Sequence, residues 1–187
     1  MDRNRIIENY RRHKLLAALH NGTYKGRCWN SDGVLLREIT GSGINELLVA
    51  LRDFVDLSFI QKANGRETDP EASEYVHAFQ RILGELPDSY LTMLKAHYIA
   101  PSRSITATQL ATAGNYKNWS SANLHYGLLG KRLYEELPIR LPMRTDGTLI
   151  YTCALATEGD LSQTEKQWQW KMRPEVAAAI DYLGLFN

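Results

Sequence analysis

The sequence has few cysteines, no long apolar run and, over one part of its length, no acidic residue. Cys28 and Cys153 are its two cysteines and lie far apart among 187 residues, so free buried thiols in a reducing compartment are expected rather than a disulfide framework. No stretch approaches the ~20 apolar residues that span a bilayer. The charged N-terminus also lacks the apolar core of a signal peptide. These absences predict a cytoplasmic protein without membrane contact.

Recognisable catalytic and metal-binding patterns are also absent. The histidines are scattered, without an HExxH pattern, an HNH-type cluster or paired-cysteine spacing; they are His13, His20, His77, His97 and His125. No Walker A loop, Rossmann glycine pattern or G-x-S-x-G elbow occurs. We therefore expect no enzyme activity, no cofactor and no metal. A nuclease with an unrecognised site stays open as a third hypothesis.

Charge is distributed unevenly although the net charge is only +1. From Ser89 to Tyr134 the chain has five basic residues and no acidic residue. Residues 1–27 hold seven Lys or Arg against two acidic residues, whereas residues 45–88 are predominantly acidic. Local asymmetry of this kind favours contact between the basic segments and a polyanion such as DNA.

The first part of the chain is expected to form a small α-β-β-α module over residues 1–60. A helix is predicted over residues 3–19 because Asn21-Gly22 suits its end. The stretches TYKGRCW and VLLREIT read as strands joined by the turn NSDG. A second helix is predicted from apolar residues at helical spacing, namely Ile44, Leu47, Leu48, Leu51 and Val55. The polar stretch 61–73 is the predicted linker.

Residues 74–187 are expected to form a winged-helix-like domain, in which three helices precede a long β-hairpin. One helix begins with a capping box between Thr106 and Gln109. The next is expected to have Ser120 as its N-cap and to pack Trp119 on Leu124. The hairpin strands are predicted in TLIYTCALAT and QWQWKM, joined by the loop at 158–166, and a last helix begins at Pro174. The predicted fold class is therefore α+β and mainly helical.

The stretch NYKNWSSANLHYGLLGKRL contains an amphipathic helix with unusual features. Its core-facing stripe is predicted to be Ala122, Tyr126, Leu129, Leu133 and Leu137. Leu124 and Leu128 then point outward, which suits contact with the wing, a neighbouring domain or a partner subunit. Gly127 and Gly130 each weaken a helix by about 1 kcal/mol relative to Ala. Close approach of another backbone would explain them.

The same stretch supplies the candidate DNA contacts. In a helix-turn-helix the start of the second helix meets base edges, and the candidates there are Lys117, Asn118, Ser120, Ser121, Asn123 and His125. Four cations would neutralise phosphate, namely Arg103, Lys117, Lys131 and Arg132. The alternative is that small polar residues gather at a helix start because they cap it.

Two further groups of residues, one basic and one aromatic, each have more than one interpretation. A secondary phosphate contact is predicted on the first helix, at Arg5, Arg11, Arg12 and Lys14, although a solvated face or a partner's acidic groove explains these residues equally well. Trp168 and Trp170 are separated by one residue, so both rings point to one side of a strand. Core packing is the favoured interpretation of this pair, with base stacking or a ligand cage as the alternatives.

The motif TATQLATAGNYKNWSSANLHYGLLGKRL resembles a DNA-recognition module that precedes HNH nuclease domains in bacterial restriction-type endonucleases. The resemblance covers about residues 100–185 and rests on the pattern ATQLA…GYKN…AANLxYGxLGRxL. The matching positions are Ala107–Ala111, Tyr116–Asn118, Ala122–Leu124, Tyr126-Gly127, Leu129-Gly130, Trp170, Met172–Val176 and Leu183-Gly184. Asn115 stands where the pattern usually has Gly. No nuclease domain follows, so the resemblance implies DNA recognition without cleavage.

The leading hypothesis is a non-enzymatic protein that binds double-stranded DNA. It would be a regulator, or the recognition component of a bacterial restriction or anti-phage system whose nuclease is a separate chain. Whether the target carries a modified base, and whether the protein is a homodimer, stay open. The rival hypothesis is a protein-interaction adaptor, such as an inhibitor or immunity-type protein, that binds an enzyme partner through Leu124, Leu128 and the acidic middle of the chain.

Overall fold

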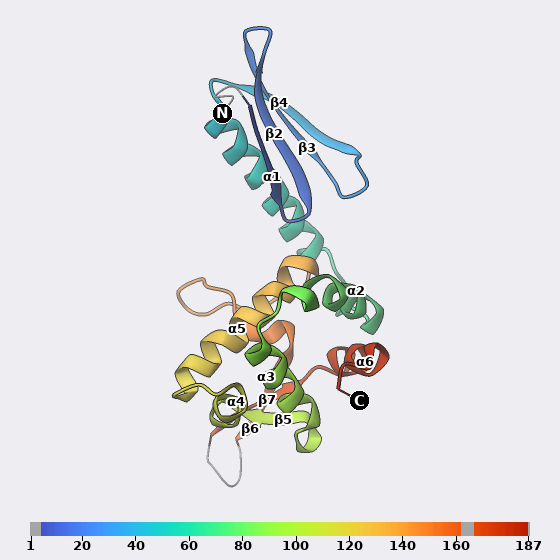
Figure 1. Cartoon of the computed structure of the whole chain (residues 1–187), viewed down its shortest axis with the longest axis vertical. Coiled ribbons are helices and arrows are strands. Elements are labelled where there is room, and N and C mark those ends of the chain that lie inside the picture. The colour runs from blue at the N-terminus through green and yellow to red at the C-terminus, as the bar shows by residue number, and fades with distance from the viewer. Residues whose placement is uncertain (1–4, 162–166, 187) are drawn as a thin grey trace. The chain divides into compact units, whose positions relative to one another are not determined.

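The computed structural model describes residues 5–161 and 167–186 and divides the chain into two compact units, Met1–Gly65 and Arg66–Asn187. Both units are drawn in Figure 1, and each is described by itself below. The protein is mixed α/β with more helix than strand. None of the helices among the described residues combines the length and the apolar character that a bilayer-spanning segment needs.

The first unit is a four-stranded antiparallel sheet followed by one long helix. The strands are ordered as in the sequence, and the helix lies along one face of their sheet (Figure 1). They are β1 (Arg5–Tyr10), β2 (His13–His20), β3 (Thr23–Trp29) and β4 (Leu35–Gly41), and the helix is α1 (Ile44–Asn64). Side chains along β2 and β3 point alternately to the two faces of the sheet, and Leu15, Ala17 and Cys28 are buried on the face that packs on α1. The opposite face of the sheet is left open.

The predicted first helix is wrong, because residues 5–20 form the β1–β2 hairpin. Leu15 and Ala17 are buried while Leu16 is only partly buried. Burial therefore repeats every second residue, as it does in a β-strand. Arg11 and Arg12 form the two-residue turn, with φ of 42° and 63°. The first unit is therefore β-β-β-β-α instead of α-β-β-α.

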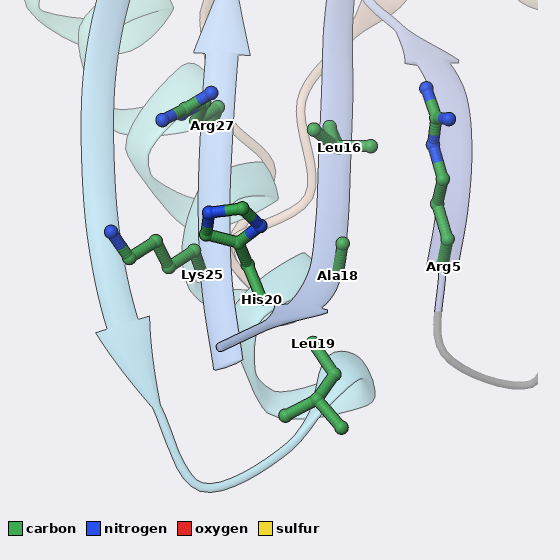
Figure 2. A pocket seen from close by; sticks show the side chains of 7 residues that line it. All are labelled: Arg5, Leu16, Ala18, Leu19, His20, Lys25 and Arg27. Carbon is green, nitrogen blue, oxygen red and sulfur yellow. The ribbon is translucent and has the colours of Figure 1, made fainter. Parts of the chain in front are cut away.

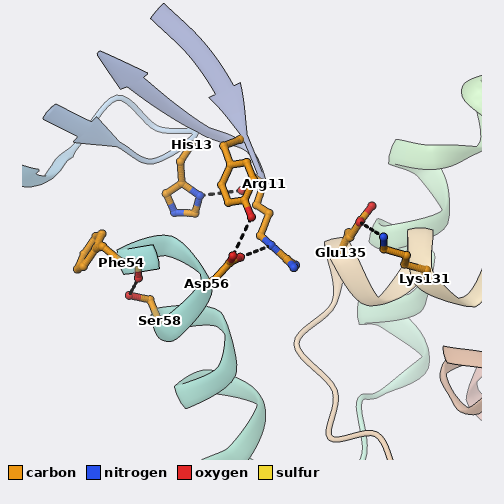
Figure 3. A network of polar contacts seen from close by, with 8 residues as sticks. Arg11, His13, Phe54, Asp56, Ser58, Lys131 and Glu135 are labelled. Carbon is orange, nitrogen blue, oxygen red and sulfur yellow. Dashed lines mark hydrogen bonds and ion pairs between the residues drawn. The ribbon is translucent and has the colours of Figure 1, made fainter. Parts of the chain in front are cut away.

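Contacts with α1 hold this turn. The Arg11 Nε lies 2.6 Å from the Asp56 Oδ1, and the Tyr10 hydroxyl donates to the same carboxylate at 2.7 Å (Figure 3). The Arg11 guanidinium also lies over the Phe59 ring, at 4.9 Å from its centroid. α1 itself continues to Asn64, so residues 61–64 are helical and not part of a linker. The two units meet in sequence at Gly65, inside the stretch predicted as a linker.

The second unit combines helices with a small antiparallel sheet. Its helices are α2 (Ala72–Ile82), α3 (Asp88–Ile99), α4 (Ala107–Gly114), α5 (Trp119–Glu136) and α6 (Pro174–Leu183). Single 3-10 turns occur at Leu83–Glu85, Pro101–Arg103 and Tyr151–Ala154. The strands β5 (Ser104–Thr106), β6 (Ala156–Leu161) and β7 (Trp168–Met172) are ordered β5-β7-β6. The core stripe predicted on α5 is confirmed, because all five of its side chains are buried.

The first strand of the predicted hairpin is partly wrong. Residues 151–154 form a 3-10 turn, and the strand begins only at Ala156. Cys153, Ala154 and Leu155 are all buried, so burial here is continuous instead of alternating. Of the predicted loop at 158–166, residues 158–161 belong to β6 and residues 162–166 lie outside the described part. The hairpin itself is present, because β6 pairs with β7.

A buried histidine joins three elements of the second unit. His97 is fully buried, and its Nε2 lies 3.1 Å from the Arg103 carbonyl oxygen and 2.9 Å from that of Trp170. Since both are acceptors, Nε2 carries the proton, and Nδ1 accepts from the Tyr126 hydroxyl at 2.6 Å. Burial lowers the pKa of His97 from 6.5 to about 4. The neutral ring therefore ties α3 to α5 and β7.

Candidate functional site

The turn between α4 and α5 is built closely on α3. The predicted capping box is confirmed, since the Gln109 amide donates to the Thr106 Oγ1 and the Thr106 amide donates to the Gln109 Oε1. α4 ends at Asn115 in the left-handed region, with φ of 57°. A Cβ at Gly114 would lie 2.7 Å from the Tyr116 ring and 2.9 Å from Met93. Only glycine therefore lets the turn fold back this tightly.

The first turn of α5 differs from the prediction by two residues. Asn118 is the N-cap, and its Oδ1 accepts from the Ser121 amide at 2.9 Å. Trp119 is the first helical residue rather than the residue before a Ser120 cap. Trp119 and Leu124 are 60% and 61% exposed, so the predicted packing between them does not form.

The stem of α5 approaches another backbone at one of its two glycines. A Cβ at Gly130 would lie 2.1 Å from the Tyr151 carbonyl oxygen, whereas one at Gly127 would meet only the Thr152 Oγ1, at 3.7 Å. The predicted close approach is thus confirmed for Gly130 alone. The contact at Gly130 places the 3-10 turn at 151–154 against α5, and that turn leads into β6.

The nine residues predicted to contact DNA lie on different sides of the second unit. Asn123 and Lys131 line grooves beside β7 and the 150s segment. His125 lies on the other flank of α5, where its ring stacks on Tyr116 at 4.5 Å and its Nδ1 lies 3.2 Å from the Tyr90 hydroxyl. Asn118 and the backbone amide of Ser121 form the N-cap hydrogen bond of α5. Ser120 is exposed.

The predicted phosphate-binding cations differ in how closely they are paired with acidic side chains. Arg103 lies 3.6 Å from Asp181 and packs over the Tyr98 ring. The two cations of α5 have weaker partners, at 3.9 Å: Lys131 with Glu135 and Arg132 with Glu85. Figure 3 shows the Lys131 pair, one helical turn apart. Lys117 is exposed and has no charged or hydrogen-bonded partner among the described residues.

Three of the four tryptophans of the protein line one groove. It has a volume of about 330 Å³ and lies where the first turns of α4 and α5 meet β7. Trp168 is 45% exposed and Trp170 is partly buried, so the favoured core interpretation is wrong for Trp168. Both rings do line the same side of β7, as predicted. The lining residues are Ala107, Trp119, Asn123, Gln167, Trp168 and Trp170.

Asn123 is the polar group shared by this groove and its neighbour. Its Oδ1 is buried and has no hydrogen-bond partner among the described residues. The second groove, of about 380 Å³, continues from Asn123 along α5 and includes Lys131 and Arg144. Neither lining includes a carboxylate among the described residues. An unpaired amide oxygen beside indole faces can accept a hydrogen bond from a planar ligand once a shift of the Asn123 side chain exposes it.

The predicted secondary phosphate contact does not lie on a helix. Arg5 stands on the open face of the first unit, and Lys14 stands there too, with its Nζ 6.0 Å from the centroid of the Trp29 ring. Arg12 occupies the hairpin turn. Arg11 points instead to Asp56 on α1, so its charge is already paired. The four residues therefore do not form one surface.

Groups suited to metal or nucleophilic chemistry do not gather in either unit. Within the described ranges, no three His, Cys, Asp or Glu side chains come together in a way that could hold a metal. Both cysteines are unpaired and buried, as predicted, and burial raises the pKa of each thiol. Neither thiol is therefore in the ionised form that acts as a nucleophile.

Sequence reasoning missed the tryptophan groove as a site. Trp119 is far in sequence from Trp168, and only the pairing of β5 with β7 brings their segments together. The signal available was the concentration of tryptophan at 119, 168 and 170. Comparison with protein-family models, with curated proteins and with solved structures gave no match to this chain.

Proposed function

We propose that the protein is a non-enzymatic, cytoplasmic DNA-binding protein whose second unit recognises double-stranded DNA. The helices and strands of this unit follow the order α3, β5, α4, α5, β6, β7, and its sheet is ordered β5-β7-β6. That arrangement supports a winged-helix-like interpretation, with α5 as the recognition helix and the β6–β7 hairpin as the wing. The resemblance over about residues 100–185 supports the same proposal.

The observation that carries the proposal is the tryptophan groove at the start of α5. In a duplex the faces of the bases are covered by their neighbours, so an exposed indole stacks only on a base that is flipped out of the helix. Such a stacking contact is worth about 1–3 kcal/mol. Asn123 offers an amide that can read the edge of an adenine. The exposed Lys117 and the amides at the start of α5 would bind phosphate. Lys131 and Arg144 in the neighbouring groove would extend this contact along the backbone.

Fluorescence anisotropy of a labelled 30-base-pair duplex tests the proposal over a salt series. We expect binding that weakens steeply with salt, because bound cations displace counterions from DNA. Replacing Lys117 and Lys131 with Gln should lower the salt slope by about 2, at roughly 0.9 for each phosphate contact. The control variant replaces Lys95 and Arg140, which are exposed and lie outside both grooves. No binding at low salt would end the proposal.

The same anisotropy assay can distinguish between types of DNA target. The resemblance to restriction-type modules supports a role in defence. Duplexes of one sequence with and without methylated bases separate a defence component that reads modification from a regulator that reads sequence. We propose that Asn123→Ala changes preference among duplexes, whereas Lys117→Gln weakens binding to all of them evenly.

A second candidate function is protein interaction. Large apolar side chains of α5 are exposed, namely Trp119 (60%), Leu124 (61%) and Leu128 (39%). Exposed apolar clusters are typical of protein interfaces. Under this alternative Leu124→Ser and Leu128→Ser abolish self-association or partner capture. Sedimentation velocity on the wild type and on this double variant measures the homodimer directly.

A further inference from the structure

The open face of the sheet in the first unit gathers positive charge. Strand pairing sets Arg5, Ala18 and Lys25 in one row across β1, β2 and β3. The adjacent row on the same face contains Leu16 and Arg27. α1 covers the opposite face, where Leu15, Ala17 and Cys28 are buried. The cations of the open face are therefore placed by register and not by a helix.

Ala18 makes a hollow between two of these cations. The hollow has a volume of about 320 Å³, and no carboxylate of the described residues lines it. Its lining is Arg5, Leu16, Ala18, Leu19, His20, Lys25 and Arg27. Figure 2 shows Arg5 on the outer strand, Leu16 and Ala18 on the next, and Lys25 and Arg27 beyond them. Arg5 and Lys25 stand two strands apart, which is about 10 Å between their backbones. Their long side chains can therefore reach one anion above Ala18.

The acidic residues within the range 5–41 of the first unit do not line this hollow. Residues 5–41 contain seven Lys or Arg and three acidic residues. Glu8 faces α1, where both of its carboxylate oxygens accept from Arg52, and Asp32 lies in the turn after β3. Glu38 is the acidic residue of the open face, and its Oε2 lies 2.5 Å from the Arg27 Nε. Arg5, Lys14 and Lys25 have no ion-pair partner among the described residues.

We propose that this open sheet face, centred on the hollow between Arg5 and Lys25, binds the phosphate backbone of duplex DNA. Lys14 extends the contact along β2, beside Trp29. The assignment to DNA, among polyanions, rests on the proposed function of the second unit. Binding would be driven by the release of counterions from the DNA, which protein cations without an ion-pair partner displace. This face reads no sequence and adds affinity for any duplex.

The test uses the full chain and a labelled 30-base-pair duplex of arbitrary sequence, with anisotropy measured over a salt series. A triple variant replaces Arg5, Lys14 and Lys25 with Gln. We expect the dissociation constant to rise at least about tenfold and the salt slope to fall by about 2 to 3, at roughly 0.9 for each contact. The matched control triple replaces Lys62, Lys95 and Arg140 with Gln, which changes the net charge equally and leaves the open face intact.

A second variant keeps the result interpretable if the triple variant folds poorly. Ala18→Glu places a carboxylate in the hollow, where it can pair with Arg5 and Lys25 across the strands and stabilise the sheet. It should weaken DNA binding as the triple variant does, whereas Ala50→Glu on the exposed surface of α1 should not. Circular dichroism confirms that both variants are folded.

The outcomes separate this inference from the proposed function. Loss of affinity in the sheet variants but not in Lys117→Gln/Lys131→Gln supports the sheet face and removes the second unit as the binding site. The reverse pattern overturns the sheet face and leaves the second unit. Equal effects in the sheet and control triples would mean that only net charge matters, which overturns the inference. Tighter binding to an RNA duplex or to vesicles with anionic lipid than to DNA also overturns it.

Discussion

The open sheet of the first unit and the groove of the second unit are built in different ways. On the sheet, strand register sets Arg5 and Lys25 on either side of Ala18. The groove depends on tertiary ties, because its position follows from Gly130 against Tyr151 and from His97 between α5 and β7. The comparison teaches that charge can be placed by local pairing, whereas an aromatic groove needs long-range packing.

The largest expected effect comes from the close approach at Gly130. Gly130→Val should destabilise the second unit by more than about 3 kcal/mol, because even its Cβ would meet the Tyr151 carbonyl oxygen at 2.1 Å. Gly127→Ala is the matched control, since its Cβ has ordinary contacts, and it should stabilise α5 by up to about 1 kcal/mol. Urea denaturation measures both. Similar effects at the two glycines would contradict the packing described for α5.

The next effect is a dependence of the stability of the second unit on pH. His97 has a pKa of about 4 when folded, while the unfolded ring titrates near its ordinary value of 6.5. Between these values the unfolded chain binds the proton and the folded chain does not. Stability is therefore complete above about pH 6.5 and falls as the pH drops, by about 2 kcal/mol at pH 5.

Denaturation of His97→Gln at pH 7 and pH 5 tests this assignment. The variant should be less stable at pH 7, because contacts of the ring are lost, and should lose most of the pH dependence. His77 is exposed on α2, so His77→Gln should keep the wild-type dependence. An unchanged pH dependence in His97→Gln would show that another group is responsible.

Loss of an indole from the groove should have a moderate effect on affinity. Trp168→Ala should weaken DNA binding about tenfold, within the range for one stacking contact, while the salt slope stays unchanged. Trp29→Ala, in the first unit, is the control and should have a smaller effect. A change in salt slope without a change in affinity at low salt would indicate that Trp168 acts through nearby charges.

The smallest expected effect concerns the start of α5. Asn118→Ala should cost about 1 kcal/mol, because the Asn118 Oδ1 accepts from the Ser121 amide. Ser120→Ala should cost little, since Ser120 is exposed and already inside the helix. Thermal unfolding of both variants measures the difference. The opposite ranking would restore Ser120 as the cap.

Local signals in the sequence predicted much of the second unit. The capping box of Thr106 and Gln109, the buried stripe of α5 and the close approach at Gly130 follow from short-range spacing and are confirmed. Asn118 and Ser120 are both good N-caps, so spacing alone could not choose between them. The aromatic groove needs a pairing between β5 and β7 that no local pattern reveals.

The first unit shows why the predicted helix failed. The run LLAAL at residues 15–19 is apolar at every position and fits a helix as well as a strand. Two-residue hairpin turns usually carry Asn or Gly, because both central residues need positive φ. Here Arg11 and Arg12 take those positions, and Asp56 and Phe59 of α1 hold Arg11. The strand assignment therefore depends on residues far along the chain.

The most direct test of the proposed function is tryptophan fluorescence in a Trp29→Phe variant, in which all remaining tryptophans line the groove. Duplex DNA is titrated at low salt while anisotropy of a labelled duplex follows binding separately. Stacking of a flipped-out base on the indoles predicts quenching of the tryptophan emission that saturates with the anisotropy signal. Asn123→Ala should change the order of affinity among duplexes in the same way in both signals. Saturable binding without any change in emission would contradict the claim that the groove contacts DNA.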